Sequence, residues 1–468
     1  MHKIFLLVLL YLGLTVPFTA MSETNPVLRM FGISENEQPT LSPEMLKGLE
    51  EVSNLIQFSC FAVYPRPTTA ECIDRVKHGI GASFDPHSGY MNVEELKKFN
   101  EETTGEFGGV GIEISKASST APLVVVNVID DAPASRAGVL AGDIILNIIT
   151  PDGKNIAVSS LKNSGDVVKL LRGTPNTTVA IKVARMGADN PIQINITREI
   201  IKVAQVKGDL IQSGNRTYAL IQNKQFSRGN KDAMRAKYFE LSKRAHGKLS
   251  GLIVSVENNP GGLLYEVYKG VDLFLDAKSI VLIKNNEQIE ELTLPRTELT
   301  PGDITNGLPM LVVVNGGSAS ASEIFSAAMK HFGRAVIVGT GRTFGKGIVQ
   351  SAYQNDPALV PGTSMKLTSS EYLIGTMDDW IPVQCIGVTP DILFEYSGIK
   401  NRERPTECDM NEHVNSGGAM ANPPLHRPIN ESNPKLYKAA EEMLEAYKAY
   451  RTPQLLEEEA KRKALEAK

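Results

Sequence analysis

The most constraining stretch of this sequence is an apolar run, Met310–Val314, that passes through two glycines into Ser-Ala-Ser-Ala-Ser. A helical pattern starts at Glu323, so the predicted order is buried strand, tight turn and helix. A serine at such a turn lies beside backbone N–H groups that have no partner inside the helix. The turn therefore suits a nucleophile and half of an oxyanion hole.

A second apolar run, Ala335–Val338, leads to Lys346 in the segment Thr-Phe-Gly-Lys-Gly. Burial disfavours a charged ammonium, so a buried lysine can have a lowered pKa and act as a general base. A helix start rich in small residues and a surface lysine would account for both segments without catalysis. The residues of these two segments alone leave both interpretations open.

Strand-like and helix-like segments alternate between residues 201 and 400. Tyr218–Ile221 and Gly251–Val256 are apolar runs of strand length, and Lys231–Ala245 between them has a helical pattern. The second run leads into Asn-Asn-Pro-Gly-Gly, which ends at Gly262. This alternation predicts a layered α/β core over residues 201–400.

Residues 103–200 have a different pattern, with glycine turns and β-branched runs. Their order of strands and helices, and above all the segment Ala134–Leu146, resembles a PDZ domain, with a generic small β domain as the alternative. In a PDZ domain a glycine-rich loop binds a terminal carboxylate through successive backbone N–H groups, and the peptide adds as a strand, here beside Val110–Ile114. The predicted carboxylate-binding residues are Phe107, Gly108, Gly109, Val110 and Gly111.

The N-terminus has the layout of a secretory signal peptide. His2 and Lys3 precede an apolar run, Ile4–Val16, and small residues follow at Ala20 and Ser22. We expect a signal peptide over 1–22 and export to the periplasm. Because the apolar run is shorter than a membrane span, an uncleaved signal that anchors the chain is the less favoured alternative. The net charge of −4 gives no reason to expect a nucleic-acid partner.

Two predicted helical regions flank the central part of the chain. Residues 40–102 form the N-terminal one, and 436–468 form a charged C-terminal tail of one or two helices that Pro453 breaks. Residues 409–435 are rich in Gly, Pro and Asn and are predicted to be a linker. If the protein is a homo-oligomer, we expect these two helical regions to mediate assembly.

Four cysteines, Cys60, Cys72, Cys385 and Cys408, fit an exported protein and allow three pairings. The pairs Cys60–Cys72 and Cys385–Cys408 are preferred because each closes a short loop. The seven histidines are scattered, and no cysteine lies in a CxxC motif. We therefore expect neither a metal site nor a cofactor.

The motifs over residues 70–395 together resemble the C-terminal processing (tail-specific) proteases, which are serine peptidases with a Ser–Lys dyad and an embedded PDZ domain. The motifs that carry the resemblance occur in the order Asp-Pro-His-Ser-Gly-Tyr, the PDZ-like module, Asn-Asn-Pro-Gly-Gly, Gly-Ser-Ala-Ser-Ala-Ser-Glu, Thr-Phe-Gly-Lys-Gly-x-Val-Gln and Gly-Val-Thr-Pro-Asp-Ile. The resemblance implies an α+β multidomain fold. In it a PDZ-like β domain precedes an α/β, crotonase-like layered peptidase core, with helical N- and C-terminal regions.

The resemblance also implies the roles of the site residues. Ser320 is the nucleophile, Lys346 the general base, and Gln350 orients the lysine amine by hydrogen bonding. The backbone N–H groups of Gly262 and Ala321 form the oxyanion hole. These assignments predict activity that favours neutral to alkaline pH, because Lys346 must be neutral to accept a proton.

Residue type alone leaves Ser318 and Ser322 as alternative nucleophiles. Glu323 is interpreted as a charge that favours the helix N-terminus and not as an acid catalyst. The chain departs from the family pattern at Ser255 and Glu257, where the family has an Asp and an Arg. It also has one residue more than usual between Val338 and the Phe-Gly-Lys segment.

The expected function is that of an exported endopeptidase whose substrates are proteins or peptides with free C-terminal tails. Whether an adaptor protein is needed stays open. The alternative from another class is a non-catalytic, PDZ-based peptide-binding protein on an inactive peptidase-like core. The departures at Ser255 and Glu257 motivate this alternative, and the presence of Ser320, Lys346, Gln350 and both glycines argues against it.

Overall fold

A computed structural model describes residues 43–63, 67–115, 122–129, 131–161, 164–276, 279–286, 288–354, 356, 359–399, 404–410, 414 and 429–466. The chain divides into two compact units, Met1–Ile73 and Asp74–Lys468. The expected signal peptide lies outside the described residues, and so does most of the expected linker 409–435. None of the described helices has the length and apolar content needed to cross a membrane.

The first unit contains α3 (Pro43–Ala62) and the start of α4 (Thr69–Ala82). The disulfide Cys60–Cys72 joins the end of α3 to α4, and the Cα atoms of the two cysteines are 5.9 Å apart. The second disulfide, Cys385–Cys408, lies in the second unit. Both preferred pairings are therefore confirmed.

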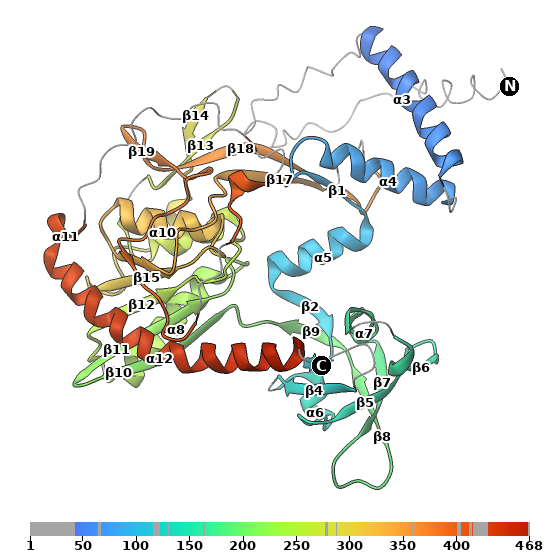
Figure 1. Cartoon of the computed structure of the whole chain (residues 1–468), viewed down its shortest axis with the longest axis horizontal. Coiled ribbons are helices and arrows are strands. Elements are labelled where there is room, and N and C mark those ends of the chain that lie inside the picture. Colours follow the sequence, from blue (N-terminus) through green and yellow to red (C-terminus); the bar gives the residue numbers. More distant parts are fainter. Residues whose placement is uncertain are drawn as a thin grey trace. The chain divides into compact units, whose positions relative to one another are not determined.

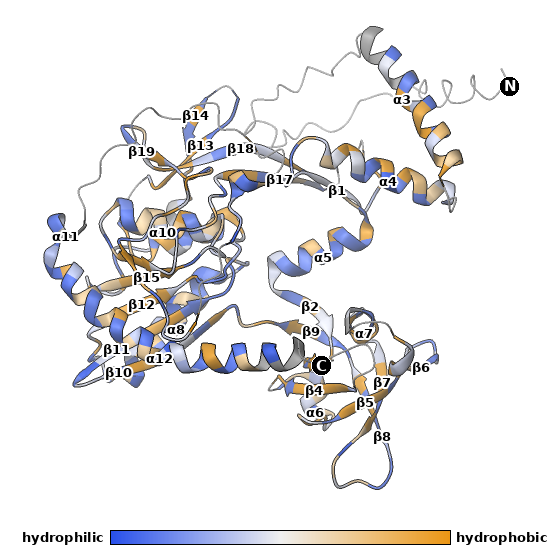
Figure 2. Ribbon diagram, in the orientation of Figure 1, coloured by the Kyte–Doolittle hydropathy of each residue, from blue (hydrophilic) through white to orange (hydrophobic). Residues whose placement is uncertain are grey.

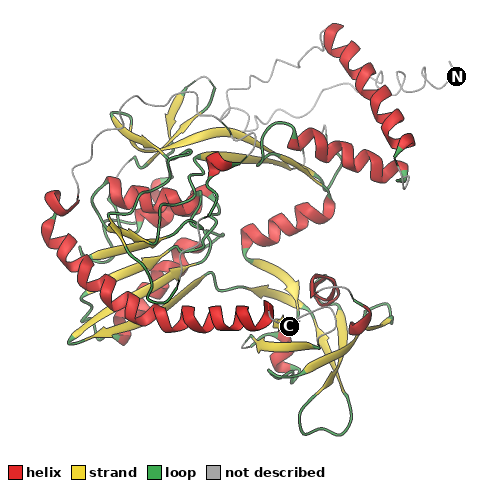
Figure 3. Ribbon diagram, in the orientation of Figure 1, coloured by secondary structure: helices red, strands yellow, loops and turns green. Residues whose placement is uncertain are grey.

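The second unit is built on a central six-stranded sheet (Figures 1 and 3). In spatial order its strands are β10 (Val206–Ser213), β11 (Arg216–Asn223), β12 (Gly251–Ser255), β15 (Met310–Val314), β16 (Val336–Gly339) and β20 (Ile392–Leu393). Neighbouring strands are parallel, except β10 and β11. Every residue of β12 and β15 is buried, as expected of parallel strands that are covered on both faces.

Helices cover both faces of this sheet. Val254 and Val312 pack in one apolar cluster with residues of α8 (Asn230–Arg244), α9 (Leu264–Asp272) and α10 (Ala321–His331). Ile253 and Leu311 point to the other face and pack with Met443 and other residues of α12 (Pro434–Glu466). Figure 2 shows the resulting concentration of hydrophobic residues on the central strands. The layered α/β core is thus as expected.

The C-terminal tail is one helix, so the prediction that Pro453 breaks it is wrong. α12 runs through Pro453 without interruption. A proline inside a helix removes one backbone hydrogen bond. Tyr450 and Leu455, on either side of it, pack on the same apolar cluster, and this packing holds both halves in line. A short helix, α11 (Ile429–Ser432), precedes α12.

A second sheet forms around one long strand, β18 (Ser364–Thr376). The strands that pair directly with β18 are β1 (Gly89–Met91), β13 (Val281–Lys284), β17 (Ile348–Gln354) and β19 (Asp379–Pro382), and β14 (Ile289–Glu291) pairs with β13. The sequence indicated only a turn before residue 91, because a three-residue strand has no periodicity to detect. β1 therefore gives the N-terminal region a direct place in the peptidase unit.

The PDZ-like module has its own sheet and its own apolar cluster. The strand order is β3 (Ile112–Ser115), β4 (Leu123–Val128), β5 (Ile144–Ile149), β7 (Thr178–Ala184) and β8 (Ile192–Thr197), with β6 (Asn155–Ala157) on β5. Two helices, α6 (Pro133–Arg136) and α7 (Ser164–Leu171), belong to the module. β3 is an edge strand of this order, and this position leaves one side of it available for strand addition.

The two ends of the PDZ-like region pair with each other. β2 (Glu106–Gly109) and β9 (Glu199–Lys202) form a two-stranded antiparallel ribbon. α5 (Val93–Thr104) leads into β2; its N-terminus has a capping box of Asn92 and Glu95, and it ends at Gly105 in the left-handed conformation. The expected glycine-rich loop is therefore part strand, and only Val110 and Gly111 connect it to β3.

Candidate active site

Ser320 lies at the sharp turn between β15 and α10. Its backbone has φ 54° and ψ −115°, in a region that residues other than glycine rarely adopt. Such strain is stored at functional sites when the surrounding contacts hold the backbone in place. The conformation is the one expected of a strained serine turn between a buried strand and a helix.

The two neighbouring serines are engaged elsewhere. The Ser318 hydroxyl donates to the carbonyl of Val256 at 2.7 Å, and the Ser322 hydroxyl donates to the carbonyl of Asn259 at 2.9 Å. Both side chains are fully buried, whereas Ser320 is partly exposed. Of the three serines, Ser320 is therefore the one placed to meet a substrate.

Glu323 is a buried carboxylate that joins the two key loops. Its Oε2 accepts the backbone N–H groups of Ser320 and Lys346, each at 2.8 Å. Its Oε1 accepts the backbone N–H of Gly345 at 2.6 Å and the hydroxyl of Thr343 at 2.5 Å. Burial raises the pKa of Glu323 to about 7 despite these four donors. Glu323 therefore does more than place a favourable charge at the helix N-terminus, the role that the sequence indicated, because it also holds the two loops together.

Tyr372 provides a second connection between the same loops. This buried residue of β18 has its hydroxyl 2.5 Å from the carbonyl of Lys346 and 3.2 Å from that of Ser320. Burial raises its pKa, so the phenol keeps its proton and acts as a donor. The serine and lysine segments thus share two buried partners, Glu323 from α10 and Tyr372 from β18.

Lys346 has the environment that a general base needs. Burial lowers its pKa to about 8, and the positive charge of Lys366 adds to this effect. Glu407, Asp85 and Glu323 act in the opposite direction. Its amine forms no hydrogen bond with any residue in the described part of the chain. A substantial fraction of Lys346 is therefore neutral near pH 8.

The glycine turn after β12 lies against Ser320. A Cβ at Gly261 would be 2.9 Å from the Cβ of Ser320, and a Cβ at Gly262 would be 2.3 Å from the carbonyl oxygen of Phe226. With φ of 112° and 145°, both positions favour glycine for backbone reasons as well. Asn259 holds the turn, since its Oδ1 accepts the N–H of Gly261 at 2.9 Å.

The two predicted oxyanion donors are unpaired. Neither the N–H of Gly262 nor that of Ala321 donates to another residue that the structure describes. Asn259 connects the two segments, because its carbonyl accepts the N–H of Ala319 at 3.0 Å. The N–H groups of Gly262 and Ala321 thus belong to two loops that are hydrogen-bonded to each other beside Ser320.

Gln350 does not make the expected hydrogen bond to Lys346. Its amide nitrogen donates to the hydroxyl of Thr368 at 3.4 Å, because a shift of register in β17 between Val349 and Gln350 places it opposite Thr368. The Thr368 hydroxyl in turn donates to Asp85 Oδ1 at 3.1 Å. Gln350 therefore belongs to the polar surroundings of Lys346 without touching its amine.

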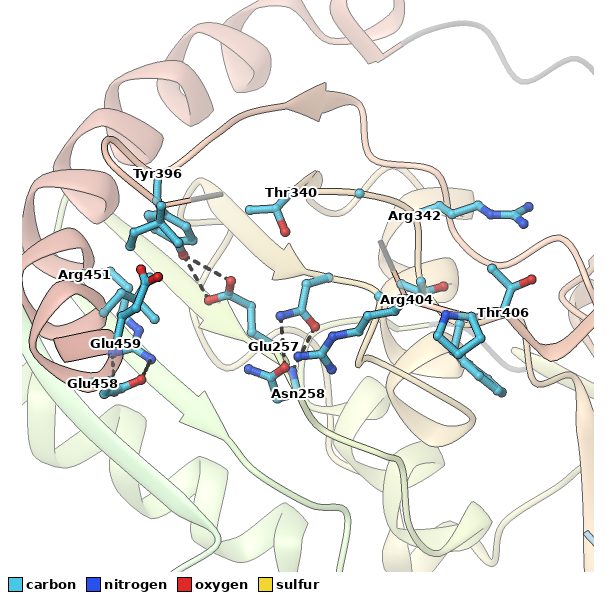
Figure 4. A pocket seen from close by; sticks show the side chains of 18 residues that line it. Glu257, Asn258, Thr340, Arg342, Tyr396, Arg404, Thr406, Arg451, Glu458 and Glu459 are labelled. Atoms are coloured by element: carbon cyan, nitrogen blue, oxygen red, sulfur yellow. Dashed lines mark hydrogen bonds and ion pairs between the residues drawn. The ribbon is translucent and has the colours of Figure 1, made fainter. Parts of the chain in front are cut away.

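Ser255 and Glu257, the two departures from the family pattern, belong to one buried cluster, of which Figure 4 shows Glu257 and Tyr396. Glu257 accepts the hydroxyls of Tyr447 at 2.5 Å, Tyr396 at 3.1 Å and Ser255 at 3.3 Å. Burial raises the pKa of this carboxyl. The cluster connects the end of β12 to Tyr447 of α12. The strand before the glycine turn is therefore held in place by these hydrogen bonds.

A cavity of about 840 Å³ lies next to this cluster, where β12, β15 and β16 end. Residues from the three following loops line it, among them Asn258, Asn315 and Arg342 (Figure 4). The extra residue expected from the family pattern would fall in the loop after β16. Gly341 has open space around it and Arg342 is exposed, so this loop has room for an insertion before Thr343, whose hydroxyl donates to Glu323.

The predicted carboxylate-binding residues lie at the start of the PDZ-like sheet. The guanidinium of Arg172 stacks 3.9 Å from the ring centre of Phe107, and Gly108 accepts a hydrogen bond from the N–H of Gly173 at 3.0 Å. Gly111 has φ 79° and its carbonyl accepts the N–H of Ile129 at 3.0 Å. Residues Arg172, Gly173 and Ile129 thus hold this segment just before the edge strand β3 begins.

Comparison with known proteins agrees with this architecture. Residues 217–394 match peptidase family S41, and residues 80–196 match a PDZ domain. The chain is 37% identical over 338 residues to the carboxy-terminal-processing protease of Bartonella bacilliformis, an alignment that covers 70% of this chain and 71% of that protein. It is 32% identical to a probable CtpA-like serine protease of Staphylococcus epidermidis, with 60% of this chain and 54% of that relative's length covered.

Among solved structures, the photosystem II D1 C-terminal processing protease is 25% identical, with a TM-score of 0.41 and coverage of 73% of this chain and 86% of that one. Fold, site and sequence relatives define a PDZ-containing peptidase of the serine type. The chain belongs to the C-terminal-processing proteases of peptidase family S41.

Proposed function

We propose that this protein is an exported endopeptidase that binds the C-terminal tails of its substrates and cleaves them with a Ser320–Lys346 dyad. The observation that carries the proposal is the shared support of the two residues. The backbone groups of Ser320 and Lys346 are hydrogen-bonded to the carboxylate of Glu323 and to the phenol of Tyr372. Burial also lowers the pKa of Lys346 to about 8. Signal-peptide layout and two disulfides support export to the periplasm.

In the acylation step, the Ser320 hydroxyl oxygen attacks the scissile carbonyl carbon and its proton passes to the neutral Lys346 amine. The N–H groups of Gly262 and Ala321 donate to the oxyanion that forms. When the C–N bond breaks, the Lys346 ammonium returns the proton to the leaving amine, and an ester on Ser320 remains. Lys346 then takes a proton from a water molecule as the water attacks the ester carbon. It returns that proton to the Ser320 oxygen when the C–O bond breaks and the product acid leaves.

The PDZ-like module would select the tail. A peptide adding antiparallel or parallel to β3 would extend the sheet at its free edge, and the residues Phe107–Gly111 would meet the terminal carboxylate. Backbone pairing gives affinity that depends little on sequence, while the free carboxylate restricts binding to chain ends. An adaptor or a homo-oligomer would modify this scheme without replacing it.

The test uses an unstructured protein with an apolar C-terminal tail as substrate. We expect the wild-type protein to cleave it and Ser320→Ala to lose at least about a thousandfold in kcat/KM. The matched control substrate differs only in a C-terminal carboxamide, and we expect slower cleavage of it. If wild type and Ser320→Ala both leave the substrate intact while binding its tail, the protein is a peptide-binding module on an inactive core.

A further inference from the structure

Glu407 is a fully buried carboxylate that the proposed mechanism does not use. Its exposed fraction is 0%, and it lies in a short 3₁₀ turn, Glu407–Asp409. The His87 Nε2 is 2.8 Å and 2.9 Å from its two oxygens. The amide nitrogen of Gln384 lies 3.4 Å from Oε1. A buried carboxylate is stable only with such partners, so its contacts indicate what it holds in place.

Two contacts connect Glu407 to the loop that carries Lys346, one through its own backbone and one through Gln384. The backbone N–H of Glu407 donates to the carbonyl of Phe344 at 3.0 Å. The side-chain oxygen of Gln384 accepts the N–H of Gly347 at 2.7 Å. Glu407 therefore contacts the residue two places before Lys346 and, through Gln384, the residue after it.

A disulfide closes this arrangement. Cys385 follows Gln384 and Cys408 follows Glu407, so the bond Cys385–Cys408 joins the chain beside both partners. The N–H of Cys385 also donates to the carbonyl of Gly345 at 2.8 Å. The two disulfide-linked segments thus contact Phe344, Gly345 and Gly347, on both sides of Lys346.

A further set of contacts comes from the turn before β1, which contains Asp85 and His87. The N–H of His87 donates to Asp85 Oδ1 at 2.8 Å, and Thr368 on β18 donates to the same oxygen at 3.1 Å. Lys346 therefore faces Asp85 from this turn, Glu407 from the 3₁₀ turn, Glu323 from α10 and Lys366 from β18. The three acidic groups raise the pKa of Lys346 against burial and against Lys366.

We propose that Glu407, itself held by His87, is a positioning residue for the catalytic lysine: it holds the loop Phe344–Gly347 in place through its own backbone N–H and through Gln384. This inference rests on the proposed function, because it assigns Lys346 a catalytic role. It assigns a role to a residue from the C-terminal part of the peptidase unit. It also makes the disulfide Cys385–Cys408 part of the structure that holds Lys346.

The first measurement does not require activity. In a Ser320→Ala background, trace labelling with acetic anhydride across pH 6–11, followed by mass spectrometry of the Lys346 peptide, gives the titration of that amine alone. Glu407→Gln removes a negative charge that faces Lys346, so we expect its labelling midpoint to fall by about half a unit to one unit. The control is Glu445→Gln, an exposed carboxylate of α12 that pairs with Lys448, for which we expect no shift.

The second measurement is kinetic, in the protein with Ser320 intact. We expect Glu407→Gln to lower kcat at least about tenfold with KM within twofold, and to move the acid limb of the pH profile to lower pH. His87→Ala should lower kcat in the same way. His87→Gln, whose amide nitrogen can replace Nε2, should recover most of it.

The outcomes separate the two proposals. If Ser320→Ala keeps full activity, the dyad is wrong, but the labelling midpoint still decides whether Glu407 acts on Lys346. A Glu407→Gln protein with a lower melting temperature, but with the labelling midpoint and kcat of the Glu445→Gln control, overturns the positioning role. If Glu407→Gln does not fold, a His87 pair in which Ala and Gln behave alike overturns it as well.

Discussion

Ser320 and Lys346 donate their backbone N–H groups to the same oxygen, Oε2 of Glu323, at 2.8 Å each. The two residues are 26 positions apart in the chain, yet one carboxylate sets the distance between the segments that carry them. Because Glu323 is itself in the first turn of α10, the same carboxylate also stabilises the helix whose N-cap is Ser320. This relationship makes Glu323 the simplest place to disturb the candidate site without changing Ser320 or Lys346.

Replacing Glu323 by Gln should disturb both loops at once. The amide keeps one acceptor oxygen but presents an NH₂ group to backbone N–H donors, so at least one of the bonds to Ser320, Gly345 or Lys346 is lost. We expect kcat/KM to fall on the order of a hundredfold, as a displacement of about 1 Å would cause. Steady-state kinetics against Glu445→Gln test this, and an unchanged kcat would show that the shared carboxylate has no role in alignment.

The proposed mechanism, in which the neutral amine of Lys346 is the base, predicts activity that rises with pH. Its pKa is lowered to about 8, so the neutral fraction is lost as pH falls below that value. We expect kcat/KM to increase about tenfold per pH unit between pH 6 and 7.5 and to level off above about pH 8.5. A profile measured on a substrate without titrating groups is the check. A midpoint near the ordinary lysine value would mean that Lys346 is not buried during the reaction.

Gly261→Ala should inactivate the site through a local clash. The added Cβ would lie 2.9 Å from the Cβ of Ser320 and 3.0 Å from the N–H nitrogen of Ala321. Gly187→Ala is the matched control, since Gly187 also has a positive φ, 87°, but nothing within 4 Å of an added Cβ. We expect both variants to lose about 1 kcal/mol of stability, and Gly261→Ala alone to lose activity. Equal activity of the two variants would contradict the close approach.

Tyr447→Phe should weaken the attachment of α12 to β12. The hydroxyl donates to Glu257 at 2.5 Å, and its removal leaves this buried carboxylate with one fewer donor. We expect the free energy of unfolding to fall by about 1–3 kcal/mol, measured by urea titration. Tyr450→Phe is the control: its hydroxyl donates to a half-exposed carboxylate, Asp209, and should cost less than about 1 kcal/mol. Similar losses in both variants would argue against the buried cluster.

Local sequence patterns predicted the parts of this molecule that neighbouring residues determine. The apolar runs 310–314 and 335–338, the glycine pair and the serine turn were enough to predict the strand, turn and helix around Ser320. The glycine turns and β-branched runs of residues 103–200 likewise predicted a small β domain, and their resemblance to a PDZ domain, above all over Ala134–Leu146, specified which one. In each case the conformation depends on residues within one or two elements, so the pattern is visible along the chain.

The local pattern was misleading where packing outweighs it. β1 is too short to show a period, and it forms because β18 offers a partner edge. Pro453 would end an isolated helix, but apolar packing on both sides of it keeps α12 continuous. The resemblance implied that Gln350 orients the Lys346 amine, whereas a shift of register in β17 places Gln350 opposite Thr368.

The sequence by itself therefore determined the local frame of the candidate site: a serine at a tight turn between a strand and a helix, a lysine after a second apolar run, and a pair of glycines. Only the tertiary structure decided what surrounds them. Glu407 and His87 are 320 positions apart, and Glu257 and Tyr447 are 190 apart. No periodicity links residues at such separations, because their contact depends on how whole layers pack. Burial, which lowers the pKa of Lys346 to about 8, arises from the same packing.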